Sequence, residues 1–184
     1  AGFFTNETVF SLTKRPKKLA VIGGRQLGFK LTHAFQRLGS KVTIIERSNQ
    51  FLRREDRDAA EILSDAFQRD NITVCLNSKL AKVTQNEQGK VLHLTGDQGE
   101  QTVTVDEILI GAGRAPNVQN MGLAQAGVDF DDHKGVTVND HLQTTNKKIY
   151  AAGDVCLKYK FTHTADASAR IVLRNALFMG RQKA

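Results

Sequence analysis

Three residues near the amino terminus stand at the spacing of a phosphate-binding turn. Gly23, Arg25 and Gly28 occupy the key positions of the pattern G-x-G-x-x-G, and Gly24 follows the first of them. In such a turn one glycine permits the bend from strand to helix, one lets the backbone approach a pyrophosphate, and one lets helix and strand pack closely. Free N–H groups at the helix start attract the phosphates. The spacing therefore predicts a dinucleotide-binding turn.

Arginine at the middle position argues against tight binding. Its side chain fills space that glycine leaves for the pyrophosphate, and a non-glycine residue at positive φ costs roughly 1 kcal/mol or more. A guanidinium that swings outward can instead bind a phosphate. We expect the steric loss at Arg25 to prevail, and a turn that binds nothing stays open as an alternative.

Glu46 supports the nucleotide interpretation. It ends an apolar stretch, 41–46, and lies 23 residues after Gly23. An acidic residue about 20 positions after the turn accepts hydrogen bonds from the adenosine ribose of NAD. Arg47 leaves the choice between NAD(H) and NADP(H) open, because a guanidinium can bind the 2′-phosphate.

The elements around the turn form a predicted α/β fold. Apolar strands at 18–23 and 41–46 flank a helix with Gly39 as its C-cap, which makes a βαβ unit with parallel strands. A helix from Asp56 to about Arg69 and a strand at 72–76 follow. Short alternating segments then predict an inserted antiparallel β-meander, and apolar runs predict further strands. The meander segments are 80–85, 90–95 and 101–105, and the later strands are 107–113, 135–139 and 149–155.

The last predicted element is a helix from about His163 to Met179. Its apolar side chains recur at helical spacing, so we expect them to form its inner face. They are Ala165, Ala169, Val172, Leu173, Ala176 and Leu177.

The composition of the chain limits the classes of protein to which it can belong. The 184 residues carry a net charge of +7, and no apolar run approaches the ~20 residues of a membrane helix. We expect the basic stretch 14–18 to be a solvated linker in preference to a nucleic-acid footprint, which needs a clustered face. Cys75 and Cys156 form no disulfide framework, and the histidines lack metal-ligand spacing. With no signal peptide visible at the amino terminus, we expect a cytoplasmic protein without membrane contact.

Four blocks of the chain resemble the class I pyridine nucleotide-disulfide oxidoreductases, flavoproteins that include mercuric reductase and dihydrolipoamide dehydrogenase. In the intact family, hydride passes from NAD(P)H to FAD and electrons then pass to a disulfide or metal-ion substrate. The resemblance covers nearly the whole chain and rests on the order and spacing of the four blocks. The blocks are 18–24 with Gly28, 42–47, 109–117, and 149–155 followed by 161–172.

The resemblance implies a role for each matching residue. Gly23 and Gly28 would flank the dinucleotide pyrophosphate, and Glu46 would bind the ribose. The block with Gly111, Ala112, Gly113 and Arg114 would line the second crossing of the nucleotide. Gly153 and Asp154 would contact the ribityl chain of FAD, and the helix near His163 would point its amino terminus at the flavin. The implied domains are a linker at 1–17, an NAD(P)-binding domain at 18–142 and part of an FAD-binding domain at 143–184.

Departures from the family pattern bear on activity. Besides Arg25, Lys30 replaces a family glutamate that lies close to the flavin. The family's redox disulfide would lie upstream of residue 1 and its dimerisation domain downstream of residue 184. We therefore assign no catalytic residue to this chain and expect Cys75 and Cys156 to be packed thiols. A non-catalytic remnant or interaction module is the alternative, and an uncovered apolar face in 149–184 predicts self-association.

Overall fold

The apolar stretch before the glycine-rich turn forms a central strand of a parallel sheet. The computed structural model describes residues 2–24, 26–53, 55–97, 99–178 and 180–184. In it, β1 (Lys18–Ile22) pairs with β2 (Lys41–Ile45) and with β7 (Glu107–Ile110), and β3 (Thr73–Cys75) pairs with β2. The resulting order β3-β2-β1-β7 confirms the predicted Rossmann-like parallel sheet.

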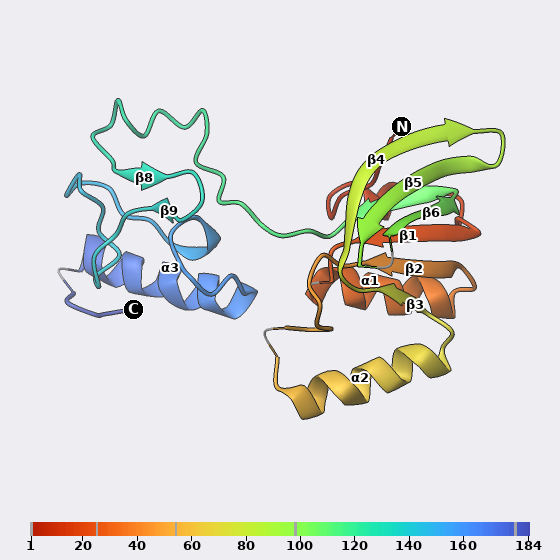
Figure 1. Ribbon diagram of the computed structural model, residues 1–184. Helices are drawn as coiled ribbons and strands as arrows, with labels where there is room; N and C mark the ends of the chain where they lie inside the picture. Colours follow the sequence, from red (N-terminus) through yellow and green to blue (C-terminus); the bar gives the residue numbers. More distant parts are fainter. Residues whose placement is uncertain (1, 25, 54, 98, 179) are drawn as a thin grey trace. The chain divides into compact units, whose positions relative to one another are not determined.

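One face of this sheet is covered by α1 (Gln26–Arg37) and α2 (Arg57–Arg69) (Figure 1). Successive side chains of a strand point to opposite faces, so Leu19 and Val21 pack on the helical side with Phe29 and Phe67. At the end of α1, Gly39 has φ +92° and its N–H donates to the carbonyl of Gln36, as expected for a C-cap glycine.

The opposite face is covered by an antiparallel meander of β4 (Ser78–Asn86), β5 (Gly89–Gly96) and β6 (Gly99–Val105). Here Ala20 of β1 packs with Leu92 and Leu94 of β5. The meander predicted from the sequence is confirmed, and the sheet lies between helices on one side and strands on the other (Figure 1).

The amino-terminal residues predicted as a linker pack on this part of the chain. Phe4 forms a parallel bridge with Leu109, and the short helix η1 (Val9–Ser11) buries Val9 in the helix-side core. The basic stretch is also held, because the Pro16 carbonyl accepts a hydrogen bond from the Ser40 hydroxyl at 2.7 Å. The four basic residues of 14–18 are exposed, as expected for a solvated stretch, and the assignment of 1–17 to a connection with a flavin domain stays a prediction.

The chain divides into two compact units, Ala1–Gly113 and Arg114–Ala184. The boundary lies at Gly113, so the predicted nucleotide domain of 18–142 extends past the first unit. In the second unit, β8 (Phe130–Asp131) and β9 (Gly135–Val136) form a hairpin, followed by η2 (Gly153–Val155) and α3 (Thr162–Leu177). Its core centres on Val118, Val128 and Val136.

Two predictions for the second unit are wrong in detail. The expected strand at 149–155 is absent from the described residues apart from a single bridge between Gln143 and Tyr150, because the backbone turns at Gly153, where φ is +77°. In place of a strand partner, the Gly153 N–H donates to the Ser168 hydroxyl of α3 at 3.0 Å.

The expected inner face of α3 is also wrong. The helix buries Ser168 and Asn175, while Leu173 and Leu177 are 55% and 68% exposed. The cause is polar anchoring, since Asn175 donates hydrogen bonds to the carbonyls of His141 and Gln182. The apolar stripe of α3 therefore lies largely at the surface, and the predicted end of this helix at Met179 is outside the described residues.

Candidate functional site

The glycine-rich turn joins β1 to α1 with little free space. Gly23 has φ +97°, and its N–H donates to the carbonyl of Ile45 at 2.8 Å. A Cβ atom at Gly23 would lie 2.7 Å from the Cα of Ala112. Only glycine combines this backbone conformation with such a close approach, so the first position performs the bend that the sequence pattern predicts.

Gly28 brings the start of α1 against the strands. A Cβ atom there would lie 2.5 Å from the carbonyl oxygen of Gly23, and one at Gly111 would lie 3.3 Å from the Cα of Gly28. The turn, the helix start and the end of β7 are thus in backbone contact. This is the geometry of the third glycine in a dinucleotide turn, which lets helix and strand pack closely.

Glu46 lies at the end of β2 beside this turn. One of its carboxylate oxygens accepts the N–H of Gly24, and the other accepts the N–H of Ser48 at 2.8 Å. Its backbone bonds to the Cys75 carbonyl and to the Ser78 N–H, which fixes it between β3 and β4. Two backbone donors hold this carboxylate in place beside the turn.

These residues border a cavity of about 380 Å³ at the carboxyl ends of β1 and β2. Ligands of open parallel sheets bind at this edge. Six of its lining residues come from the turn, the ends of β1 and β2 and the end of the β7 block, and three come from the start of β4. The lining consists of Ile22, Gly23, Ile45, Glu46, Arg47, Ser78, Lys79, Leu80 and Ala112.

The contribution of Ser78, Lys79 and Leu80 was not anticipated from the sequence, which placed residues 80–85 in a meander without a role in the site. The available signal was position, because a segment that follows a parallel strand of this sheet begins at the ligand edge.

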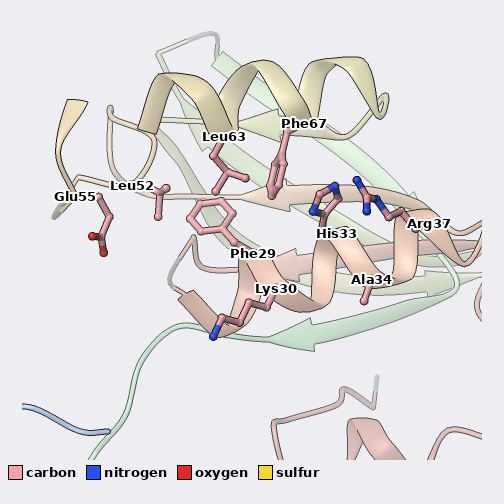
Figure 2. Close-up of a pocket in the computed structure, with 9 residues that line it drawn as sticks. All are labelled: Phe29, Lys30, His33, Ala34, Arg37, Leu52, Glu55, Leu63 and Phe67. Atoms are coloured by element: carbon pink, nitrogen blue, oxygen red, sulfur yellow. The ribbon is translucent and has the colours of Figure 1, made fainter. Parts of the chain in front are cut away.

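A larger cavity of about 620 Å³ lies between α1 and α2 and does not include the turn. Figure 2 shows Phe29, Leu63 and Phe67 pointing toward one another, with His33 and Arg37 further along α1. Phe29 and Phe67 belong to an aromatic cluster whose third member, Phe51, has its ring centroid 4.6 Å from that of Phe29. No glycine of the turn and no end of a sheet strand lines this larger cavity, so the predicted nucleotide residues border only the smaller of the two cavities.

Lys30, which replaces a family glutamate, lies on α1 at the edge of the larger cavity and is exposed (Figure 2). A positive side chain therefore stands at the surface where the resemblance implies a negative one.

The second unit holds the residues predicted to contact FAD. The Arg114 guanidinium donates to the Asp154 carboxylate at 2.9 Å and to the Lys160 carbonyl at 3.2 Å. The ring of His163 stacks on Phe161 with centroids 5.4 Å apart, so this histidine packs against a neighbouring aromatic side chain. Asp154 keeps 45% of its side chain exposed, so it remains accessible to a ligand hydroxyl.

The two cysteines are half-buried free thiols. Burial raises the pKa of Cys75, and it raises the pKa of Cys156 to about 11. A high pKa keeps a thiol protonated and unreactive at neutral pH. The described part of the chain contains no group of side chains suited to a metal ion, and none of its helices is long and apolar enough to cross a membrane.

Comparison with known proteins shows which family shares this fold. Residues 2–169 match the family model for pyridine nucleotide-disulphide oxidoreductases. The chain belongs to this family. Its glycine-rich turn, parallel sheet and inserted meander are therefore a portion of the fold of a pyridine nucleotide-disulphide oxidoreductase.

Individual members of the family are similar over most of the chain. A mercuric reductase of Lysinibacillus sphaericus is 33% identical over 175 residues, which are 95% of this chain and 32% of that protein. A dihydrolipoyl dehydrogenase of Bacillus subtilis is 35% identical over 87% of this chain and 34% of its own length. The solved structure of the HOCl-induced flavoprotein disulfide reductase RclA from Escherichia coli aligns with a TM-score of 0.90 at 28% identity, covering 99% of this chain and 41% of that one.

The chain thus spans about a third of the length of the curated relatives named above. Within this oxidoreductase portion, most predicted nucleotide residues meet at one edge of the sheet, and their binding roles stay predictions. Those brought together are Gly23, Gly24, Gly28, Glu46, Arg47, Gly111 and Ala112. Arg25 lies outside the described residues. Gly113 ends the first unit, and Arg114, Gly153, Asp154 and His163 belong to the second.

Proposed function

We propose that this chain is the nucleotide-binding part of an FAD-dependent pyridine nucleotide-disulfide oxidoreductase and that it binds NAD(P)H. The observation that carries the proposal is the cavity at the carboxyl ends of β1 and β2, where the Gly23 turn, Glu46 and Ala112 meet. The glycines bring the turn, the start of α1 and Ala112 into backbone contact beside this cavity, which suits a turn that lets its backbone approach a pyrophosphate, and Glu46 offers acceptors that fit ribose hydroxyls.

Residues of the chain hold the dinucleotide in this proposal. The pyrophosphate would bind against the turn at Gly23 and Gly24 and the start of α1. Ala112 would line the place where the nucleotide passes the sheet edge a second time. In the second unit, Asp154 offers an exposed carboxylate for the ribityl chain of FAD. FAD, when bound, accepts hydride from NAD(P)H and delivers electrons to a disulfide or metal-ion substrate.

A non-catalytic interaction module is the competing proposal. The observation that favours it is the exposed Lys30 on α1, which puts a positive charge where the family carries a carboxylate. Arg25 is a second basic departure in the same segment. An anionic partner surface in place of a flavin would suit both changes.

Titration with NADH, followed by its fluorescence, separates the two proposals. Saturable binding in the micromolar range supports the oxidoreductase part, and absence of binding up to millimolar NADH supports the interaction module.

Arg25→Gly restores the missing glycine of the turn. We expect this variant to bind NADH roughly tenfold more tightly, because the backbone regains space for the pyrophosphate. Arg15→Gln is the control, since this arginine contacts the Gly39 carbonyl away from the cavity. Equal affinity of Arg25→Gly and the unmodified chain would contradict an obstructing role of Arg25.

A further inference from the structure

The charged groups that line the nucleotide cavity are one acid and two bases among the described residues. The acid is Glu46, and the bases are Arg47, which directly follows it, and Lys79 at the start of β4. The charge of the lining is therefore one negative against two positive, a net +1. Both bases lie near Glu46, which would bind the adenosine ribose, because Arg47 directly follows it and the Ser78 N–H beside Lys79 donates to the Glu46 carbonyl at 3.0 Å.

The negative charge of Glu46 is already engaged within the protein. Its two carboxylate oxygens accept the backbone N–H groups of Gly24 and Ser48. Hydrogen bonds from two donors hold the carboxylate beside the turn and spread its charge. Glu46 thus stabilises the turn itself, and its repulsion of an anion in the cavity is reduced.

The two basic side chains, unlike the Glu46 carboxylate, are free of such contacts among the described residues. Neither the Arg47 guanidinium nor the Lys79 ammonium makes a hydrogen bond or ion pair with any residue that the structure describes, and both residues are exposed. Lys90 of the same unit, in contrast, pairs with Glu107. Ser78 does not compete as a donor, because its hydroxyl donates to the Leu76 carbonyl at 2.9 Å.

We propose that Arg47 and Lys79 bind the 2′-phosphate of NADPH, so that the chain prefers NADPH to NADH, and this rests on the proposed function. Arginine presents paired N–H donors that match phosphate oxygens, and lysine adds a mobile point charge. A 2′-hydroxyl can accept a hydrogen bond from these donors but carries no negative charge to attract them. Arg47 and Lys79 belong to different parts of the chain. Lys79 lies outside the sequence pattern of the dinucleotide turn, so the sequence alone does not indicate it.

Two small probes isolate this contact. Adenosine 2′,5′-bisphosphate and adenosine 5′-monophosphate differ only in the 2′-phosphate, and each presents one 5′-phosphate to the turn. Any effect of Arg25 is therefore shared and cancels in the ratio of their affinities. By calorimetric titration of the whole chain, we expect the bisphosphate to bind roughly tenfold more tightly, with an advantage that shrinks as salt is raised.

Single substitutions test which residues cause the tighter binding of the bisphosphate. Arg47→Gln and Lys79→Gln should each lower the bisphosphate affinity several-fold and leave the monophosphate affinity within about twofold. Lys82→Gln is the matched control, because Lys82 is an exposed lysine of β4 that does not line the cavity. Circular dichroism confirms that each variant is folded.

The outcomes separate this inference from the function on which it rests. Equal affinity for the two probes, or a bisphosphate advantage that survives both substitutions, overturns the role of Arg47 and Lys79 and leaves dinucleotide binding standing. If neither probe nor NADH binds, the proposed function fails and this inference fails with it.

Discussion

Single glycines decide whether the nucleotide turn can exist. At Gly23 the backbone is in the left-handed region, and at Gly28 the helix start touches the carbonyl of Gly23. Any side chain at Gly28 must push on backbone atoms, which cannot rotate away as a flexible side chain can. The fit of helix on strand and the shape of the nucleotide cavity therefore depend on the same atoms.

Gly28→Ala tests this dependence. Its Cβ would lie 2.5 Å from the Gly23 carbonyl oxygen, so we expect a loss of about 1–3 kcal/mol of unfolding free energy from overpacking and NADH binding at least tenfold weaker. Urea unfolding and NADH titration measure the two effects. Gly2→Ala is the control, because its added Cβ has no described atom within 4 Å. Unchanged binding in folded Gly28→Ala would contradict the tight turn.

Thr32 is a second residue whose environment makes a prediction. It is fully buried in α1, and its hydroxyl has no hydrogen-bond partner among the described residues. Burying an unpaired hydroxyl costs free energy, so Thr32→Val, which keeps the shape, should stabilise the chain by about 1 kcal/mol in urea unfolding.

Thr144→Val provides the contrast to Thr32→Val. The buried Thr144 hydroxyl lies 2.9 Å and 3.0 Å from the carbonyl oxygens of Asn146 and Ile149. The same substitution there should destabilise. A loss of stability in both variants would show that the Thr32 hydroxyl has a partner.

Among the secondary-structure elements, α2 is tied to α1 by the residue that ends it. Asp70 is the C-cap of α2, and its carboxylate contacts His33 at 2.5 Å and Arg37 at 3.5 Å. Its backbone carbonyl accepts a hydrogen bond from Gln36 at 2.8 Å. These polar contacts join the two helices beside the larger cavity, where Phe67 supplies the apolar contact.

The Asp70 contact predicts an acid-sensitive stability. The His33 hydrogen bond, with a smaller contribution from the Arg37 charge, lowers the pKa of Asp70 below its ordinary 3.8. A group with a lowered pKa stabilises the fold above its unfolded pKa and loses this contribution as pH falls through the folded value. We expect the difference in urea midpoint between the unmodified chain and Asp70→Asn to be constant near neutral pH and to shrink below about pH 4.

Asp65→Asn, an exposed position on the same helix, is the control for Asp70→Asn. It should leave the acid dependence unchanged. A pH-independent gap between the unmodified chain and Asp70→Asn would rule out the ionised contact as the source of stability.

The elements also show what the sequence could predict. Continuous apolar runs correctly indicated β1 and β2, and short alternating segments with polar turns correctly indicated the meander, because these strands pack on the two cores of the first unit. The strand expected at 149–155 failed because its backbone bonds go to Ser168 and to isolated bridges, which no local pattern encodes. The face of α3 failed for a related reason, since Asn175 is buried through hydrogen bonds to residues distant in sequence or beyond the helix.

The same limit applies to the candidate site. Glu46 was predictable because it follows the turn at a characteristic spacing. Lys79 was not, since its place depends on how β4 leaves the sheet.

For the whole molecule, the exposed apolar side chains of the second unit bear on association. Leu173, Leu177 and Phe178 are all more than half exposed on or beside α3. Leu173 and Leu177 lie one helical turn apart on the same face of α3, and exposed apolar side chains grouped in this way favour association. The chain spans about a third of the curated relatives compared above, and we propose that, on its own, it associates with a second copy through this stripe.

Light scattering across a range of concentrations measures this association. We expect the mass to rise with concentration, and the double variant Leu173→Lys with Leu177→Lys to remain monomeric, because two charges oppose burial of the stripe. Ile62→Lys, at a residue of α2 that is 70% exposed, is the control and should associate like the unmodified chain. A monomer at all concentrations would contradict the proposal.

The most direct test of the central claim is the titration of the purified, folded chain with NADH and NADPH, followed by nucleotide fluorescence. The geometry of the Gly23 turn, Glu46 and Ala112 predicts saturable binding of both nucleotides in the micromolar range, which Gly28→Ala weakens. No binding of either nucleotide up to millimolar concentration, by a chain that circular dichroism shows to be folded, would contradict it.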